Sequence, residues 1–88
     1  MNLDFKRSFA RDLKRVKEKN VLQQLSQVIQ SIEAAADLAD IDHLKKLSRG
    51  SEHYRIKLGD YRIGLVIEEE TVIFVRILHR KEIYRYFP

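Results

Sequence analysis

The stretch that decides the fold is His53-Tyr54-Arg55-Ile56-Lys57-Leu58-Gly59-Asp60-Tyr61-Arg62-Ile63-Gly64-Leu65-Val66. Apolar and polar side chains alternate on both sides of Gly59-Asp60, which is typical of two strands joined by a two-residue turn. The glycine supplies the positive φ that such a turn requires. The resulting register pairs Leu58 with Tyr61, Lys57 with Arg62, Ile56 with Ile63, Arg55 with Gly64 and Tyr54 with Leu65. One face of the hairpin is therefore predicted to be apolar and the other cationic.

The cationic face places Lys57 directly opposite Arg62, with Arg55 two residues further along the first strand. Like charges opposed on a sheet are destabilising, by roughly 0.2–1 kcal/mol per pair. The ordinary interpretation is a solvated face on which the long side chains splay apart. The alternative is a binding site for a polyanion, and the spacing alone leaves both open.

The N-terminal half predicts a short strand followed by two helices. Residues 1–5 alternate, with Leu3 and Phe5 on one face. Ser8 is placed as an N-cap for a first helix, whose buried stripe is predicted to be Phe9, Leu13 and Val16. The outer face of this helix is basic. Such a face is usually only solvated, and contact with a phosphate backbone is the alternative.

A second helix is predicted from an Asn20 cap, completed by Gln23, to about Ala36. Its apolar positions recur at helical spacing and are Val21, Leu22, Leu25, Val28, Ile29 and Ile32. We interpret this stripe as core. Residues 37–43 lack the glycine and terminal glutamate of a calcium loop and are interpreted as a solvated connection.

The run from Thr71 to Leu78 is the most β-prone of the chain and predicts a further strand. A three-residue loop over residues 68–70 would pair Ile67 with Thr71, Leu65 with Ile73, Ile63 with Val75 and Arg62 with Arg76. On that register the cationic row would be Lys57, Arg62 and Arg76, and the apolar face would be Ile56, Ile63, Leu65, Ile73 and Val75. Residues 79–88 are too short for an independent element, and the simplest expectation is a frayed tail anchored through Tyr84 or Phe87.

Composition narrows the class of protein. The chain has 88 residues, of which 44% are hydrophobic, so one domain spanning residues 1–88 is expected. The absence of cysteine excludes disulfides and thiolate metal sites, and the three histidines show no metal-ligand spacing. No signal-peptide pattern or membrane span is visible, so we expect a cytoplasmic protein. A net charge of +4 is typical of a nucleic-acid binder.

The hairpin residues Tyr54-Arg55-Ile56-Lys57-Leu58 and Gly59-Asp60-Tyr61-Arg62-Ile63, followed by Leu78-His79-Arg80-Lys81-Glu82-Ile83-Tyr84, resemble the RelE/ParE toxin superfamily on its RelE side. The similarity covers essentially the whole chain. It implies an α+β fold of order β-α-α-β-β-β, in which an N-terminal strand and an antiparallel pair of helices pack on a small, mainly antiparallel sheet. It also implies a toxin of a type II toxin–antitoxin system, with a cognate antitoxin protein as partner.

RNA carries its own nucleophile, the 2′-hydroxyl, so a ribonuclease can work without a metal when it supplies a base, an acid and cations around the phosphate. The resemblance implies this chemistry, applied to mRNA in the ribosomal A site, with no cofactor. It assigns the phosphate cations to Arg55, Lys57 and Arg62, the general acid to Arg80 and the general base to Tyr84. Lys81 is the alternative acid, and Glu82 or His79 the alternative base. The family's first sheet lysine is Arg55 here.

The competing interpretation is the ParE branch, which shares the fold but inhibits DNA gyrase by binding and has no chemistry of its own. ParE-like toxins lack the full basic set with its tyrosine, and this chain has that set. We therefore expect a metal-independent endoribonuclease. A gyrase-directed or other protein-binding toxin is the alternative.

Overall fold

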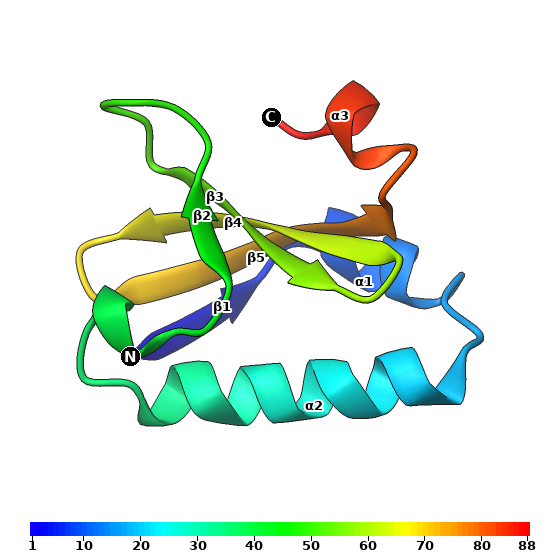
Figure 1. Cartoon of the computed structure of the whole chain (residues 1–88), viewed down its shortest axis with the longest axis horizontal. Helices are drawn as coiled ribbons and strands as arrows, with labels where there is room; N and C mark the ends of the chain where they lie inside the picture. Colours follow the sequence, from blue (N-terminus) through cyan, green and yellow to red (C-terminus); the bar gives the residue numbers. More distant parts are fainter.

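A five-stranded sheet runs through the middle of the molecule, in the computed structural model that describes residues 1–88 (Figure 1). Its spatial order is β1-β5-β4-β3-β2. The strands are β1 (Asn2–Phe5), β2 (Leu44–Lys46), β3 (His53–Leu58), β4 (Tyr61–Glu68) and β5 (Thr71–His79). β1 pairs with β5 in parallel, and every other pair is antiparallel. The predicted α+β class, with a mainly antiparallel sheet, is confirmed.

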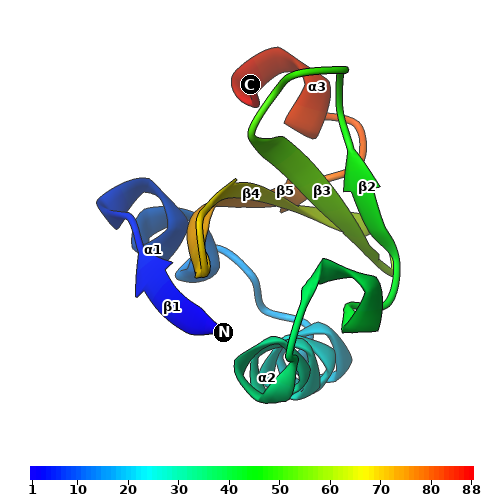
Figure 2. The ribbon, with the colours of Figure 1, turned by 90° about the vertical axis from the view of Figure 1, so that its left-hand side faces the viewer.

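The helices lie on both sides of this sheet. They are α1 (Arg7–Leu13), α2 (Lys19–Ala34) and the single-turn α3 (Ile83–Tyr86), with a 3-10 turn, η1, at Leu38–Asp40. Figures 1 and 2 show α2 along one face and α3 above the opposite face. We call the face covered by α2 the helix face, and the opposite face, beneath α3, the outer face of the sheet. No helix is long and apolar enough to cross a membrane.

The hydrophobic core lies on the helix face, because the apolar positions of the strands meet the apolar stripe of α2 there. From α2 it takes Val21, Leu25 and Ile32, all at most 5% exposed. Phe9 of α1 joins it through an edge contact with Phe74, at 5.4 Å between ring centroids. From the sheet the core takes Ile56, Leu58, Ile63, Leu65, Ile67, Val72, Phe74 and Ile77.

The hairpin register predicted from Gly59-Asp60 is confirmed in full. Lys57 lies opposite Arg62, Ile56 opposite Ile63, and Arg55 opposite Gly64. Gly59 has a φ of 60°, as the turn requires. A one-residue slip would have exchanged the two faces, so this register fixes which side chains can reach the outer face.

The predicted register between β4 and β5 is wrong. The connection has two residues, because Glu68 pairs with Thr71 and Glu69 takes a positive φ of 54°. A bulge then leaves an additional residue, Val75, in β5: Leu65 lies opposite Phe74, whereas Gly64 lies opposite Arg76. Val72 and Phe74 therefore join the core in place of Ile73 and Val75. Arg62 lies opposite Leu78, so the expected row of Lys57, Arg62 and Arg76 does not form.

Both predicted helix caps are also wrong. α1 begins at Arg7, so Ser8 lies inside its first turn and donates its hydroxyl to the Val75 carbonyl at 2.5 Å. α2 begins at Lys19 rather than after Asn20, and its N-cap, Glu18, makes no side-chain capping bond. α1 ends at Leu13, so Val16 is buried from the connection beyond it.

Three further elements were not expected from the sequence. η1 is closed by a capping box in which the Asp37 side chain accepts from the Ala39 N–H at 2.8 Å, so residues 37–43 are not merely a solvated connection. β2 adds an edge strand next to β3. α3 gives the tail an ordered turn. The tail is anchored by Ile83 and Phe87, at 0% and 5% exposed, whereas Tyr84 is 71% exposed and is not an anchor.

Candidate active site

The outer face of the sheet carries an open cationic cavity of about 330 Å³ beneath α3. We call it the cationic cavity and define it by its six lining residues, which are His43, Lys45, Arg55, Lys57, Arg62 and Tyr84. The structure therefore brings together four of the five residues singled out by the resemblance. The fifth, Arg80, does not line the cavity.

Strand pairing explains why these cations converge. Lys45 of β2 lies opposite Arg55 of β3, and Lys57 lies opposite Arg62 of β4. Because side chains alternate along a strand, Arg55 and Lys57 point to the same face, and their cross-strand partners point there with them. The result is a two-by-two arrangement of positive charge, which is a favourable site for a phosphate.

The Tyr84 ring lies over Arg55, with the guanidinium carbon 4.7 Å from the ring centroid. This is a cation–π arrangement, worth about 0.5–1 kcal/mol at an exposed site. It places a phenol beside the phosphate cations. The Tyr84 side chain is 71% exposed, so its hydroxyl is accessible to a ligand.

Arg62 is held close to its own turn rather than extended over Lys57. One guanidinium nitrogen donates to the carbonyls of Gly59 and Tyr61, both at 2.8 Å. These bonds draw the charge toward the hairpin and relieve part of the repulsion that the register creates. Lys57 has no such partner and is exposed.

Two alternative bases from the sequence, His79 and Glu82, lie elsewhere. They line a second cavity of about 170 Å³ together with Asp12, Arg15 and Tyr61, among others. Beside it the interaction between the Glu18 carboxylate and the Tyr61 hydroxyl lowers the pKa of Glu18 and raises that of Tyr61. His79 uses Nδ1 to accept the Lys81 backbone N–H at 3.2 Å. Neither group is placed beside the phosphate cations.

Arg80 follows β5 in the turn before α3. Its backbone N–H donates to the Asp60 carbonyl at 2.7 Å, and its guanidinium lies 3.9 Å from the Asp60 carboxylate. The side chain is 57% exposed. The long contact with Asp60 is the one ion pair of the Arg80 side chain, and neither Arg80 nor its alternative Lys81 lines the cationic cavity.

Arg76 belongs to the scaffold. Its guanidinium donates to both carboxylate oxygens of Asp12, at 2.7 and 3.0 Å, and these bonds raise the pKa of Arg76. Asp12 also accepts the Ile77 N–H at 3.1 Å and is 4% exposed. The pair ties α1 to β5 and neutralises a charge that the sequence had placed in the cationic row.

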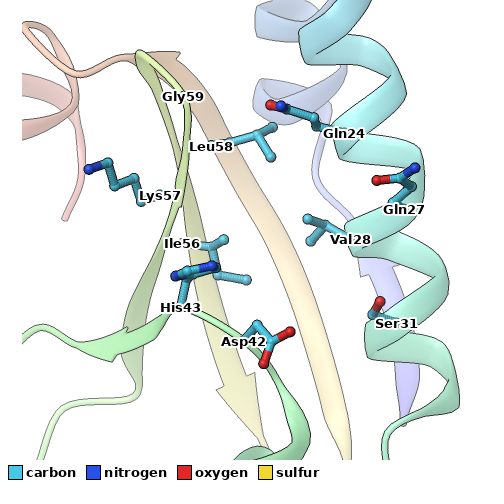
Figure 3. Close-up of a pocket in the computed structure, with 10 residues that line it drawn as sticks. All are labelled: Gln24, Gln27, Val28, Ser31, Asp42, His43, Ile56, Lys57, Leu58 and Gly59. Atoms are coloured by element: carbon cyan, nitrogen blue, oxygen red, sulfur yellow. The ribbon is translucent and has the colours of Figure 1, made fainter.

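A cavity of about 370 Å³, larger than the cationic cavity, lies on the other side of β3. Figure 3 shows Leu58, Ile56 and Val28 directed into the space between β3 and α2, whereas Lys57 points away from it. Its rim is mostly uncharged, with Gln24, Gln27 and Ser31 along α2. It lacks the concentration of charge that a phosphate requires. Its size therefore does not make it the candidate active site.

His43 and Lys45 also line the cavity, and neither was predicted from the sequence to do so. Lys45 enters because β2 pairs with β3, and a three-residue strand gives almost no periodic signal. His43 precedes that strand with a φ of 62°, an uncommon value for a residue other than glycine. The structure shows no group of three or more His, Cys, Asp or Glu side chains placed to hold a metal ion.

Comparison with known proteins agrees with this geometry. A family profile described as ParE toxin of type II toxin-antitoxin system, parDE, matches residues 3–84. Toxin RelE3 of Methanocaldococcus jannaschii is 37% identical over 89 residues, and the alignment spans all of both chains. The chain therefore belongs to the RelE/ParE superfamily of toxins from type II toxin–antitoxin systems.

Within that superfamily it is a RelE-like toxin. A chain of the RelB-RelE antitoxin-toxin complex from Methanococcus jannaschii is 35% identical and superposes with a TM-score of 0.81, over 97% of this chain and 99% of that one. YafQ from E. coli shares the fold at 16% identity, with a TM-score of 0.63 over 94% of this chain and 97% of that one. The resemblance seen in the hairpin and tail is confirmed.

Proposed function

We propose that this toxin is a metal-independent endoribonuclease that cleaves mRNA in the ribosomal A site. The observation that carries the proposal is the cationic cavity, in which Tyr84 lies over Arg55 beside Lys57 and Arg62. Deprotonation of the 2′-hydroxyl lets it attack the adjacent phosphorus. The 5′-oxygen of the next nucleotide leaves, and a 2′,3′-cyclic phosphate forms. Atoms and electrons balance without water or a metal.

Five residues of the cavity and Arg80, which lies outside it, have roles in this step. Tyr84 is the general base that takes the 2′-hydroxyl proton, because its ring lies over Arg55 and lines the cavity beside the phosphate cations. Arg55, Lys57 and Arg62 bind the phosphate oxygens and stabilise the extra negative charge of the pentacovalent transition state. Lys45 extends this positive surface along the RNA. The proton for the leaving 5′-oxygen is assigned to Arg80.

A cognate antitoxin is the expected partner, as in the RelB-RelE complex of the similar archaeal toxin. The cationic cavity is a suitable surface for an acidic antitoxin segment, because charge complementarity favours association there. The alternative function is a ParE-like toxin that binds gyrase. We retain this alternative because the matching family profile is described as ParE toxin. The set of three cations with a tyrosine favours the ribonuclease, since binding alone does not require a base beside a phosphate site.

One experiment separates these functions. Purified toxin is incubated with ribosomes programmed with a defined mRNA, and, in parallel, with DNA gyrase and relaxed plasmid. We expect cleavage of the mRNA inside the A-site codon and normal supercoiling. Inhibition of gyrase without cleavage would establish the alternative and exclude the proposal.

Lys57→Ala should separate activity from stability. Lys57 is exposed and opposes Arg62, so its removal relieves repulsion and should leave the free energy of unfolding unchanged or slightly higher. Loss of one phosphate contact should lower the single-turnover cleavage rate by about 10²-fold. Lys46→Ala is the matched control, because it removes the same charge from the neighbouring strand but stands opposite Tyr54. If Lys57→Ala unfolds readily instead, the lysine is structural.

Arg80→Ala tests the acid. We expect a loss of roughly 10²-fold in cleavage rate, typical of a positioned proton donor. Stability should change little, since the Asp60 contact is long and exposed. Lys81→Ala and His43→Gln are compared in the same single-turnover assay. Near-normal activity of Arg80→Ala would move the acid to whichever of these variants is slow.

A further inference from the structure

The C-terminal segment that carries Tyr84 is attached to the sheet separately from the main core. Leu78, Ile83 and Phe87 form their own buried cluster on the outer face, with Leu47 and Val75 packed against it. None of these five residues belongs to the fifteen-residue core on the helix face. The position of α3 over the cationic cavity therefore depends on this small cluster.

Gly64 lies directly beneath the Phe87 ring of this cluster. A Cβ atom at this position would lie 2.6, 2.7 and 2.8 Å from three atoms of the Phe87 ring. Real Cβ atoms essentially never come so close, and no positive φ is recorded for Gly64. The glycine is thus required for space rather than for backbone freedom. The Phe87 ring occupies the place of the missing side chain.

This contact is directly connected to the candidate active site. Gly64 lies opposite Arg55 in the sheet, and Arg55 is the residue over which Tyr84 stacks. Phe87 follows Tyr84 by three residues, about one helical turn, and its N–H donates to the Ile83 carbonyl at 2.8 Å. The ring also has an edge contact with His53, at 5.5 Å between centroids. Anchoring Phe87 over Gly64 consequently sets where Tyr84 meets Arg55.

The rest of α3 cannot replace this anchor. Tyr84 is 71% exposed, and its only specific contact is the exposed stack on Arg55. Tyr86 is 49% exposed and stacks on Arg76 at 5.4 Å, at β5 rather than β3. Ile83 is fully buried but stands at the start of the helix. Without Phe87 the turn would be held at one end only.

We propose that Gly64 and Phe87 are positioning residues, which together hold Tyr84 over Arg55 in the geometry that RNA cleavage requires. The inference rests on the proposed function for its kinetic consequence, but the placement of Tyr84 is independent of that function. A general base must lie within hydrogen-bonding reach of the proton it removes. Displacement of α3 by a fraction of a turn is enough to lose the rate while the core stays folded.

The test uses the full chain with Gly64→Ala and, as a variant that creates no collision, Phe87→Ala. The matched control is Val66→Ala, which lies two residues along the same strand and is half-buried. Placement is read by NMR, from the nuclear Overhauser effect between the Tyr84 ring protons and the Arg55 side chain. Activity is read as single-turnover cleavage on programmed ribosomes, in the wild-type and the Tyr84→Phe background.

We expect both variants to lose the nuclear Overhauser effect between Tyr84 and Arg55. Their cleavage rate should fall at least about tenfold, while their affinity for ribosomes stays within about threefold of wild type. In the Tyr84→Phe background the same two substitutions should lower the cleavage rate by less than about threefold, because they act by placing a hydroxyl that this background already lacks. Val66→Ala should retain both signals.

The inference would be overturned if both variants kept the nuclear Overhauser effect between Tyr84 and Arg55. It would also be overturned if they lowered the cleavage rate as much in the Tyr84→Phe background as in wild type. A wild-type protein that cleaves nothing would remove the proposed function instead. In that case the NMR arm still decides whether Gly64 and Phe87 hold the tyrosine in place.

Discussion

Tyr84→Phe is expected to lower the single-turnover rate of mRNA cleavage by about 10²–10⁴-fold, the usual worth of a positioned acid or base. The substitution keeps the ring and its stack on Arg55 and removes only the oxygen that takes the proton. Because Tyr84 is 71% exposed, the free energy of unfolding should not change measurably. Affinity for ribosomes, measured by co-sedimentation, should also be retained.

Tyr86→Phe is the matched control, since it removes the same hydroxyl from the same short helix, where the ring stacks on Arg76 instead. It should cleave at the wild-type rate. If Tyr84→Phe cleaves within a few-fold of wild type, Tyr84 is not the base. His43 would then be the remaining candidate, because it lines the cationic cavity whereas His79 and Glu82 do not.

Asp12→Ala should lower the free energy of unfolding by about 3 kcal/mol, a larger loss than we expect for Lys57→Ala, Arg80→Ala or Tyr84→Phe. The substitution removes two charge-assisted bonds to Arg76 and leaves the Ile77 N–H without its acceptor. A domain of this size typically has only about 5–15 kcal/mol in total, so the shift is readily measured by urea unfolding. The loss should be smaller than for a fully buried pair, because Arg76 is 23% exposed.

Asp42→Ala serves as the comparison, because Asp42 is exposed and precedes β2 without a tertiary partner. Its unfolding midpoint should match that of wild type. An Asp12→Ala variant as stable as Asp42→Ala would mean that the bond between α1 and β5 contributes nothing, and that aromatic packing of Phe9 holds α1 alone.

The hairpin could be predicted from the sequence because its signals are local. Gly59 sets the turn, and the alternation of Ile56 and Ile63 with their charged neighbours sets the face. That register alone predicts that Arg55, Lys57 and Arg62 share one face of the hairpin, without any tertiary information. Fourteen consecutive residues therefore determine the charge distribution of the hairpin.

The features that were missed depend on distant contacts. The bulge at Val75 shifts β5 relative to β4, and Phe87 packs over Gly64 beside it. Ser8 was expected to cap α1 but donates to the Val75 carbonyl, a partner 67 residues away in the chain. No local pattern announces such a partner. The ordered position of Tyr84 belongs to the same class, because it depends on the cluster beneath α3.

The most direct test of the central claim is the chemistry of the cut ends. Purified toxin is given ribosomes programmed with an mRNA whose A-site nucleotides carry either a 2′-hydroxyl or a 2′-O-methyl group. In-line attack by the 2′-oxygen predicts a 2′,3′-cyclic phosphate on one product, a 5′-hydroxyl on the other, and no cleavage at the methylated position. Cleavage of the methylated mRNA at the same bond, or products ending in a 3′-hydroxyl, would contradict the account.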